Sequence, residues 1–229
     1  MLRPVVLVAA LPALVLIAAC SGGSGADGST TLPTVTPEAG RATYYAADGS
    51  GACSFDPSPN DLDVAAMDAP EWNGSEVCGA CVSVKGPMGT VTVRIVDLCP
   101  GCEVGHLDLS EQAFAQIADV SAGNVPITWV VVPCDVTGDL VYEYKSGTSQ
   151  WWTAIQVQNS RRIVESLEWM ANGVWTTIPR ESYNYFLVSS GVGPDPIKVR
   201  ITALTGEQLV DMLPAPASGL SVQGSVQFN

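Results

Sequence analysis

Six of the seven cysteines in this chain lie between positions 53 and 134, and this clustering constrains the fold more than any other feature. The six are Cys53, Cys78, Cys81, Cys99, Cys102 and Cys134. Two of the pairs have the C-x2-C spacing of a zinc ribbon, but a zinc site would leave Cys53 and Cys134 as free thiols. An even set of cysteines in an exported chain favours three disulfides, and the sequence alone leaves their connectivity open. No metal site is expected.

The first residues indicate export. Arg3 supplies a positive start, and the apolar run that follows is too short for a membrane span. The run ends in Leu16-Ile17-Ala18-Ala19-Cys20, which matches a bacterial lipoprotein processing site. We therefore expect residues 1–19 to be a signal peptide and Cys20 to carry lipid at the cell surface. The alternative is an ordinary secretory signal and a secreted protein.

Composition and charge narrow the class of partner. Residues 20–39 are rich in Ser, Gly, Thr and Pro, which predicts a flexible tether. Without Arg3 the chain has nine Lys and Arg against 23 Asp and Glu, a net charge of −14. Nucleic acid and anionic polymers repel such a protein, so we expect a neutral partner and no nucleic acid. Two domains are expected, at 40–134 with the six cysteines and at 135–229 without any.

The first of these domains has the pattern of a β-barrel. Short alternating or β-branched runs occur at 42–45, 82–85, 90–96 and 127–132, with turn residues between them. One helix is expected at 111–118, capped by Ser110. Trp129 lies in an apolar strand and is expected in the core. Trp72 lies in a loop, and the sequence does not distinguish a side chain that stacks on a sugar from one that is buried.

Two carboxylates, Asp97 and Asp108, lie eleven positions apart on either side of a turn bounded by cysteines. We expect both at places where regular structure ends, which is where binding clefts are built. Loss of solvation next to Leu107 and Leu109 would favour the protonated form of Asp108, as a proton donor requires. His106 is the single histidine, and we expect it to make a structural hydrogen bond.

The pattern of the second domain predicts an immunoglobulin-like β-sandwich. Strand patterns occur at 140–144, 151–158, 164–169, 186–189, 197–202 and 208–212. Ala171-Asn172-Gly173 predicts a hairpin between Trp169 and Trp175. Alternation along 151–158 places Trp151 toward the core and Trp152 toward solvent. An exposed indole indicates a binding face.

The segments around the two aspartates resemble a known family. Asp97-Leu98, then His106-Leu107-Asp108-Leu109-Ser110 and Ala113-Phe114, are similar to the first domain of expansins. The resemblance implies a six-stranded double-psi β-barrel, akin to family-45 endoglucanases, with Thr43, Asp97 and Asp108 in a polysaccharide groove. It also implies the disulfides Cys53–Cys78, Cys81–Cys134 and Cys99–Cys102. Related bacterial expansins have a tyrosine in the groove where this chain has Cys99.

The same comparison bears on hydrolysis. Endoglucanases of this barrel type carry a general base at a position where this chain has Ala46. The nearby Asp48 lies in a Gly/Ser-rich loop. Inverting hydrolysis needs two carboxylates, one of which activates water. The resemblance therefore implies binding and loosening of a glucan without efficient cleavage, so we expect no enzyme activity and no cofactor.

The second domain resembles the family-63 carbohydrate-binding module of bacterial expansins, most closely over residues 145–157. That resemblance implies a flat aromatic strip of Trp151, Trp152 and Tyr183 that stacks on cellulose, with Lys145 assisting. It conflicts with the alternation that turns Trp151 inward, and a bulge at the start of the strand would expose both indoles.

The sequence thus predicts an all-β, monomeric, lipid-anchored bacterial expansin-like protein. Its expected partner is cellulose or a related glucan, and its expected contact with a membrane is only through lipid on Cys20. One alternative is a peptidoglycan lytic transglycosylase of the rare-lipoprotein type, which combines a lipid anchor with this barrel and needs a single acid. The other is a cellulose-binding adhesin whose barrel is inert.

Overall fold

A computed structural model describes residues 36–229 of the chain. The expected signal peptide, Cys20 and most of the expected tether lie outside the described residues. The first strand, β1 (Glu38–Tyr45), begins two residues before the expected start of the barrel domain at position 40. Among the described residues, no helix has the length and apolar character needed to cross a membrane.

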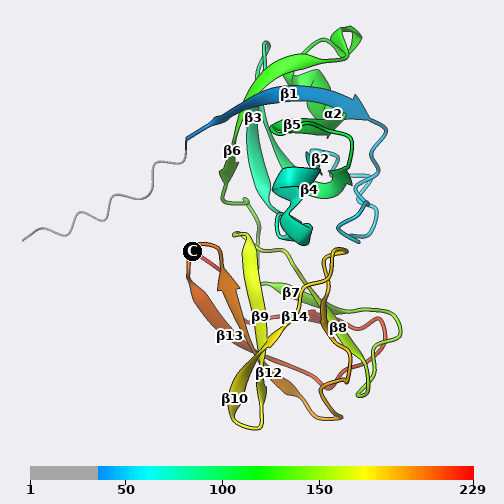
Figure 1. Ribbon diagram of the computed structural model, residues 1–229, viewed down its shortest axis with the longest axis vertical. Coiled ribbons are helices and arrows are strands. Elements are labelled where there is room, and N and C mark those ends of the chain that lie inside the picture. Colours follow the sequence, from blue (N-terminus) through cyan, green and yellow to red (C-terminus); the bar gives the residue numbers. More distant parts are fainter. Residues whose placement is uncertain (1–35) are drawn as a thin grey trace, which may run out of the picture. The chain divides into compact units, whose positions relative to one another are not determined.

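Six strands close into a barrel in the order β1-β5-β2-β4-β3-β6 (Figure 1). Their bounds after β1 are β2 (Val64–Asp68), β3 (Cys81–Lys85), β4 (Thr90–Cys99), β5 (His106–Ser110) and β6 (Val125–Val132). The pairs β1–β5 and β2–β4 are parallel, and the other neighbours are antiparallel. This is the double-psi β-barrel that the sequence predicted.

Short helices complete this part of the chain. They are α1 (Ala69–Trp72), η1 (Asn73–Ser75), α2 (Glu111–Ile117) and η2 (Val120–Ala122). The predicted cap of α2 is confirmed, because the Ser110 side chain accepts a hydrogen bond from the Ala113 amide at 3.0 Å. Phe114 and Ile117 on α2 are fully buried, and the Phe114 ring lies 5.0 Å from that of Tyr44. The helix therefore covers one side of the barrel core.

The expectation that both aspartates lie where regular structure ends is wrong. Asp97 lies inside β4, and Asp108 is the central residue of β5. β5 has only five residues, and β2 is buried along its whole length and so shows no alternation. β5 does alternate, with Leu107 and Leu109 buried, but the alternation is too short to distinguish a strand from a loop.

Burial decides the role of the two barrel tryptophans. Trp129 is in the core as expected, and its indole donates a hydrogen bond to the Gly105 carbonyl at 3.0 Å. Trp72 is also buried, with 5% of its surface exposed. It ends helix α1 and packs into the same core, so it is not available to stack on a sugar.

All six cysteines of the barrel region are in disulfides. The pairs are Cys53–Cys78, Cys81–Cys134 and Cys99–Cys102, the connectivity that the resemblance implied. The zinc alternative is thereby excluded for these thiols. Within residues 36–229, no group of three or more His, Cys, Asp or Glu side chains is placed to hold a metal ion.

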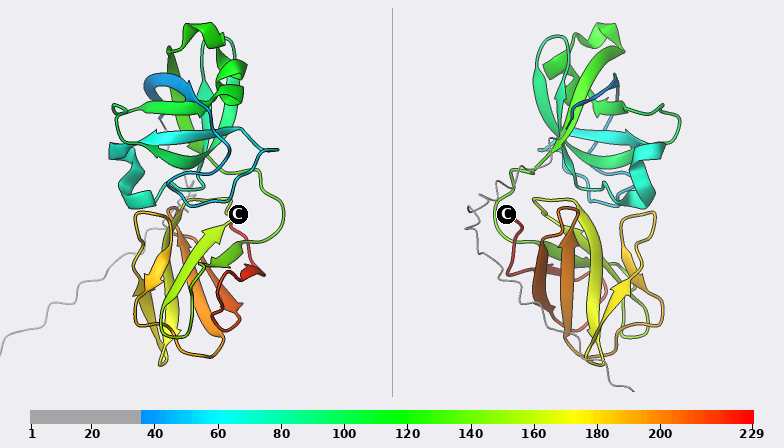
Figure 2. Two further views of the ribbon diagram at one scale, coloured as in Figure 1. Left: turned by 90° about the vertical axis from the view of Figure 1, so that its right-hand side faces the viewer. Right: turned by 60° about the vertical axis from the view of Figure 1, so that its left-hand side comes forward.

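The rest of the chain forms two four-stranded sheets, with the orders β10-β9-β12-β13 and β11-β8-β7-β14 (Figure 2). The strands are β7 (Val141–Tyr144), β8 (Thr153–Gln158), β9 (Val164–Ala171), β10 (Val174–Ile178), β11 (Phe186–Val188), β12 (Ile197–Ala203), β13 (Gln208–Leu213) and β14 (Ser221–Gln223). One apolar core is shared by side chains of both sheets, as in the predicted sandwich. The predicted hairpin is confirmed, since Asn172 and Gly173 join β9 to β10 with positive φ angles.

Candidate functional site

Thr43 links two polar side chains across the parallel pair β1–β5. Its partner in the strand register is Asp108. The Thr43 hydroxyl donates to Asp108 Oδ1 at 2.5 Å and lies 2.9 Å from His106 Nε2. Because a hydroxyl has one proton, the bond to Asp108 leaves His106 Nε2 as the donor in the other bond. His106 thus makes the expected structural hydrogen bond, and it orients the hydroxyl that holds Asp108.

Asp97 is fixed from a different part of the chain. Its Oδ1 accepts the amide of Ala52 at 2.7 Å and that of Leu98 at 2.8 Å. The loop after β1 packs closely on this carboxylate, since a Cβ atom on Gly51 would lie 2.5 Å from Asp97 Cγ. A β-bulge between Ile95 and Asp97 turns the side chain out of the barrel core, while Ile95 stays buried.

Tyr45 lies close enough to Asp97 and Asp108 for their charges to act on it, and sequence reasoning missed it. Its hydroxyl is buried and has no hydrogen-bond partner among the described residues. Burial raises the pKa of Tyr45, and the negative charges of Asp97, Asp108 and Asp48 raise it further. Tyr45 follows Thr43 by two positions on β1, so both point to the same face. We call Thr43, Tyr45, Asp97, His106 and Asp108 the acid cluster.

Asp48 lies near this cluster in the loop after β1. The side chain is exposed and accepts hydrogen bonds from the Ser50 amide at 2.9 Å and the Ser50 hydroxyl at 2.6 Å. These bonds lower the pKa of Asp48, so the carboxylate is ionised at neutral pH. Ala46, where the resemblance would place the endoglucanase base, is exposed and lies just beyond the end of β1.

The two tryptophans of the second domain precede strand β8 and are not part of it. A tight turn places Ser149 opposite Trp152, with amide-to-carbonyl bonds of 2.8 and 3.3 Å between them. Alternation therefore does not apply to Trp151, and the inward orientation expected from it is wrong. The Trp151 side chain is 73% exposed, and Trp152 is partly exposed. The backbone of Gly191 packs on this turn, where a Cβ atom would lie 2.0 Å from the Gln150 carbonyl oxygen.

Lys145 and two tyrosines lie together in the same domain. The Lys145 ammonium is 4.6 Å from the ring centre of Tyr185 and 5.5 Å from that of Tyr183. The two rings are 5.9 Å apart. Tyr185 is almost fully buried and Tyr183 is partly exposed, so Tyr185 supports the ring that reaches solvent. Sequence reasoning had named Tyr183 and Lys145 but not Tyr185.

A double-psi barrel with a clustered pair of aspartates, followed by a sandwich with an exposed indole, defines a class of two-domain β-proteins with one polar and one aromatic surface. Residues 38–129 match the family model described as lytic transglycolase. The chain is 38% identical to Expansin-YoaJ of Bacillus subtilis over 199 residues, which cover 82% of this chain and 85% of the relative. This chain belongs to the expansin family.

A solved structure shows the same two-domain fold. The apo expansin of Clavibacter michiganensis is 34% identical, with a TM-score of 0.78, and the match covers 85% of this chain and 98% of that one. A mutant of the same expansin, solved in complex with cellohexaose, matches with a TM-score of 0.79.

Proposed function

We propose that this protein binds cellulose or a related glucan of the cell wall and loosens its non-covalent contacts without hydrolysing it. The observation that carries the binding part is the exposed indole of Trp151, beside Trp152 and near the Lys145–Tyr183 pair. An indole that is 73% exposed on a folded domain has an apolar face with no partner within the described chain. The flat faces of glucan rings fit such a surface, and the complex of the Clavibacter expansin with cellohexaose supports this choice of ligand.

Asp108 is the residue that we propose acts on the bound glucan in the barrel. The Thr43 hydroxyl holds one of its carboxylate oxygens, which leaves the other free to accept a hydrogen bond from a sugar hydroxyl. Asp97 has one oxygen occupied by two amides in the same way. Both aspartates can therefore compete for hydroxyls that join neighbouring glucan chains, which is the non-covalent step that loosening requires.

The substitution Asp108→Asn tests this role. We expect it to abolish the extension of stressed cellulose-rich wall strips while binding to cellulose is retained, because Asn replaces one carboxyl oxygen with an amide nitrogen that donates a hydrogen bond and accepts none. Asp195→Asn, at an exposed position of the second domain, is the matched control and should leave both properties unchanged. Extension by Asp108→Asn at the rate of the unmodified protein would exclude the proposed role.

The substitution Trp151→Ala tests the aromatic surface separately. Loss of one stacked ring should weaken cellulose binding by about 1–3 kcal/mol, roughly 5- to 150-fold. Trp175→Ala on strand β10 removes an indole from the other sheet and should have no such effect. Pull-down isotherms on microcrystalline cellulose measure both, and equal losses for the two variants would contradict the assignment.

A second candidate is cleavage of peptidoglycan, which the family model matched by residues 38–129 favours through its description as lytic transglycolase. Asp108 would then be the single acid required. Release of muropeptides from purified sacculi, with Asp108→Asn as the inactive control, would establish that activity. A cellulose-binding adhesin is the third reading, and it predicts binding with no wall extension at all.

We also propose that the protein is anchored by lipid on Cys20. Its three disulfides fit an oxidising compartment outside the cytoplasm. Replacement of Cys20 by Ser should move the protein from the membrane fraction of its host to the medium. Labelling with a radioactive fatty acid distinguishes an anchor from an ordinary secretory signal.

A further inference from the structure

A cavity of about 300 Å³ lies apart from the acid cluster and the exposed tryptophans. Its lining comes both from the barrel region, with Phe55 and Arg94, and from the sandwich, with Arg162, Arg180 and Phe186. Hydrogen bonds connect these two parts next to it, including Gln156 to the Cys53 carbonyl at 2.8 Å and the Cys134 amide to the Arg161 carbonyl at 3.0 Å. None of the residues proposed to contact glucan lines the cavity.

The cavity concentrates positive charge in an acidic protein. Three of its lining residues are arginines, and Asp61 is the one carboxylate in the lining. The ion pairs among residues 36–229 are Arg94–Asp61, at 3.4 Å, and Arg200–Glu168. Arg162 and Arg180 therefore make no ion pair with an Asp or Glu side chain of the described residues, although the negative charge of Glu76 acts on Arg180. A guanidinium group with unoccupied nitrogens in a partly enclosed space can bind an anion.

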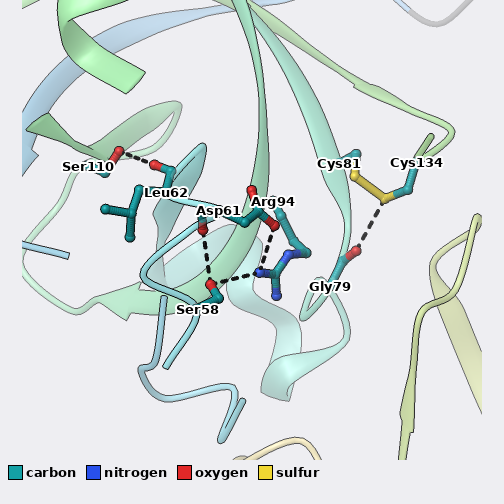
Figure 3. Close-up of polar contacts among 8 residues, drawn as sticks. All are labelled: Ser58, Asp61, Leu62, Gly79, Cys81, Arg94, Ser110 and Cys134. Atoms are coloured by element: carbon teal, nitrogen blue, oxygen red, sulfur yellow. Dashed lines mark hydrogen bonds and ion pairs between the residues drawn. A yellow bond between two sulfur atoms is a disulfide. The ribbon is translucent and has the colours of Figure 1, made fainter. Parts of the chain in front are cut away.

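Some of these guanidinium nitrogens are available to a ligand. Arg162 donates through Nε to the main-chain oxygen of Asn229 at 2.6 Å, and its two terminal nitrogens make no other hydrogen bond within residues 36–229. Figure 3 shows Arg94 directed toward Ser58 and Asp61, and both of its contacts use one terminal nitrogen. Arg180 is more occupied, since it donates to the carbonyls of Ser75 and Val164 and to Asn184.

Arg180 still contributes its charge to the cavity. Burial lowers its pKa to about 10, an effect that the negative charge of Glu76 partly offsets. The guanidinium is therefore protonated at neutral pH. It lies 4.4 Å from the centre of the Phe186 ring, and Arg94 lies 5.4 Å from that of Phe55, so the aromatic rings hold both cations in place.

The cavity also offers acceptors for hydroxyl groups. The amide nitrogen of Gln158 donates to Glu143 at 2.8 Å, and that of Asn159 donates to the Thr137 carbonyl at 2.9 Å. The side-chain oxygens of Gln158 and Asn159 accept no hydrogen bond from the described residues. They can therefore accept hydrogen bonds from a ligand. The guanidinium groups can donate hydrogen bonds to a carboxylate, and the amide oxygens can accept hydrogen bonds from hydroxyl groups. A ligand with both groups, a hydroxylated acid, fits this lining.

We propose that this cavity binds a sugar acid, such as a single uronic acid unit, with the carboxylate on Arg162 and Arg94 and the hydroxyls on Gln158 and Asn159. The volume lies at the lower end of the range for ligand pockets, about 300–1,000 Å³, which fits one sugar unit and not a polymer segment. The negative charge of the whole protein opposes a polyanion such as pectin. Local positive charge inside an acidic surface thus selects a free sugar acid or the end of an otherwise neutral chain.

Calorimetric titration of the full chain with glucuronate, glucose and inorganic phosphate tests this proposal. We expect glucuronate to bind and glucose to bind at least tenfold more weakly, and glucuronate affinity to fall with added salt. Arg162→Gln removes the least occupied guanidinium and should weaken glucuronate binding roughly tenfold, since it removes a charge-assisted hydrogen bond. Arg41→Gln, an exposed arginine that bonds Asn124 on the barrel, is the matched control and should bind as the unmodified chain does.

Three outcomes would overturn the proposal. Glucuronate could bind no better than glucose, Arg162→Gln could match Arg41→Gln, or phosphate could bind as tightly as glucuronate and so show a general anion site. A neutral oligosaccharide that ends in one uronic acid distinguishes a chain end from a free sugar acid, and either result supports the site. The proposal does not depend on the proposed glucan function, because Asp108→Asn and Trp151→Ala should leave glucuronate binding unchanged.

Discussion

Single side chains in the barrel are placed by partners from distant parts of the sequence. Thr43 and Asp108 are 65 positions apart, and Asp97 and the Ala52 amide are 45 positions apart. Sequence reasoning selected Thr43, Asp97 and Asp108 through a resemblance, but it did not predict these bonds. It missed Tyr45, whose buried hydroxyl comes under the charges of both carboxylates only after β1 and β5 are paired.

Glu71 is a partly buried acid that no motif indicated. Its pKa is raised from 4.5 to about 9, first by burial and then by the carboxyl groups of Asp68 and Glu38. Asp68 is itself fully buried and accepts the amides of Glu71, at 3.0 Å, and Gly105, at 2.9 Å. The folded protein therefore favours protonated Glu71.

The upward shift of the Glu71 pKa predicts how the stability of the protein depends on pH. The contribution of Glu71 is complete below pH 4.5 and is lost as pH rises toward 9, because the unfolded chain releases the proton first. Glu71→Gln keeps a neutral side chain and should be more stable than the unmodified protein at pH 8. Since solvent reaches part of Glu71, we expect about 1 kcal/mol and not the full linkage energy.

Urea unfolding between pH 5 and pH 9 measures this effect. The difference between Glu71→Gln and the unmodified chain should grow with pH. Glu111→Gln, at an exposed position in helix α2, should show a difference that does not change over this range. A constant difference for Glu71→Gln as well would contradict the raised pKa.

At the scale of helices and strands, sequence patterns predicted correctly those features that depend on interactions between near neighbours. The helix at Glu111–Ile117 and the Asn172-Gly173 hairpin were confirmed because a cap and a turn act over a few residues. Strands β2 and β5 were missed because β2 is buried along its whole length and shows no alternation, and because β5 has only five residues. Trp151 was misplaced because strand alternation was extended into the turn that precedes β8.

Ser110 joins two elements, and its loss should affect both. The side chain caps α2 through the Ala113 amide, and its hydroxyl donates to the Leu62 carbonyl just before β2 (Figure 3). Ser110→Ala should lower the free energy of unfolding by about 2 kcal/mol, since it removes a cap and leaves a carbonyl unpaired.

Thermal and urea unfolding measure that loss. Ser121→Ala, an exposed residue that bonds Asp119 in η2, should cost less than half as much. If the two substitutions cost the same, Ser110 contributes no more than an exposed turn residue.

At the scale of the whole molecule, the disulfides stabilise loops of very different length. Cys81–Cys134 joins residues 53 positions apart, whereas Cys99–Cys102 joins residues three positions apart. Chain entropy predicts a loss of about 4 kcal/mol when the long loop is opened and about 2 kcal/mol for the short one. Double Cys→Ser variants of each pair, compared by urea unfolding, should preserve this order. A larger loss for the short loop would contradict it.

The sequence by itself determined the two-domain, all-β architecture, the even set of barrel cysteines, the capped helix and the residues that carry the family resemblance. Each of these depends on composition, on periodicity or on interactions between near neighbours. Only the tertiary structure decided that Trp72 is buried, that Trp151 is exposed, that both aspartates act on Tyr45 and that three arginines line one cavity. These features depend on contacts between residues far apart in the chain, which no local pattern records.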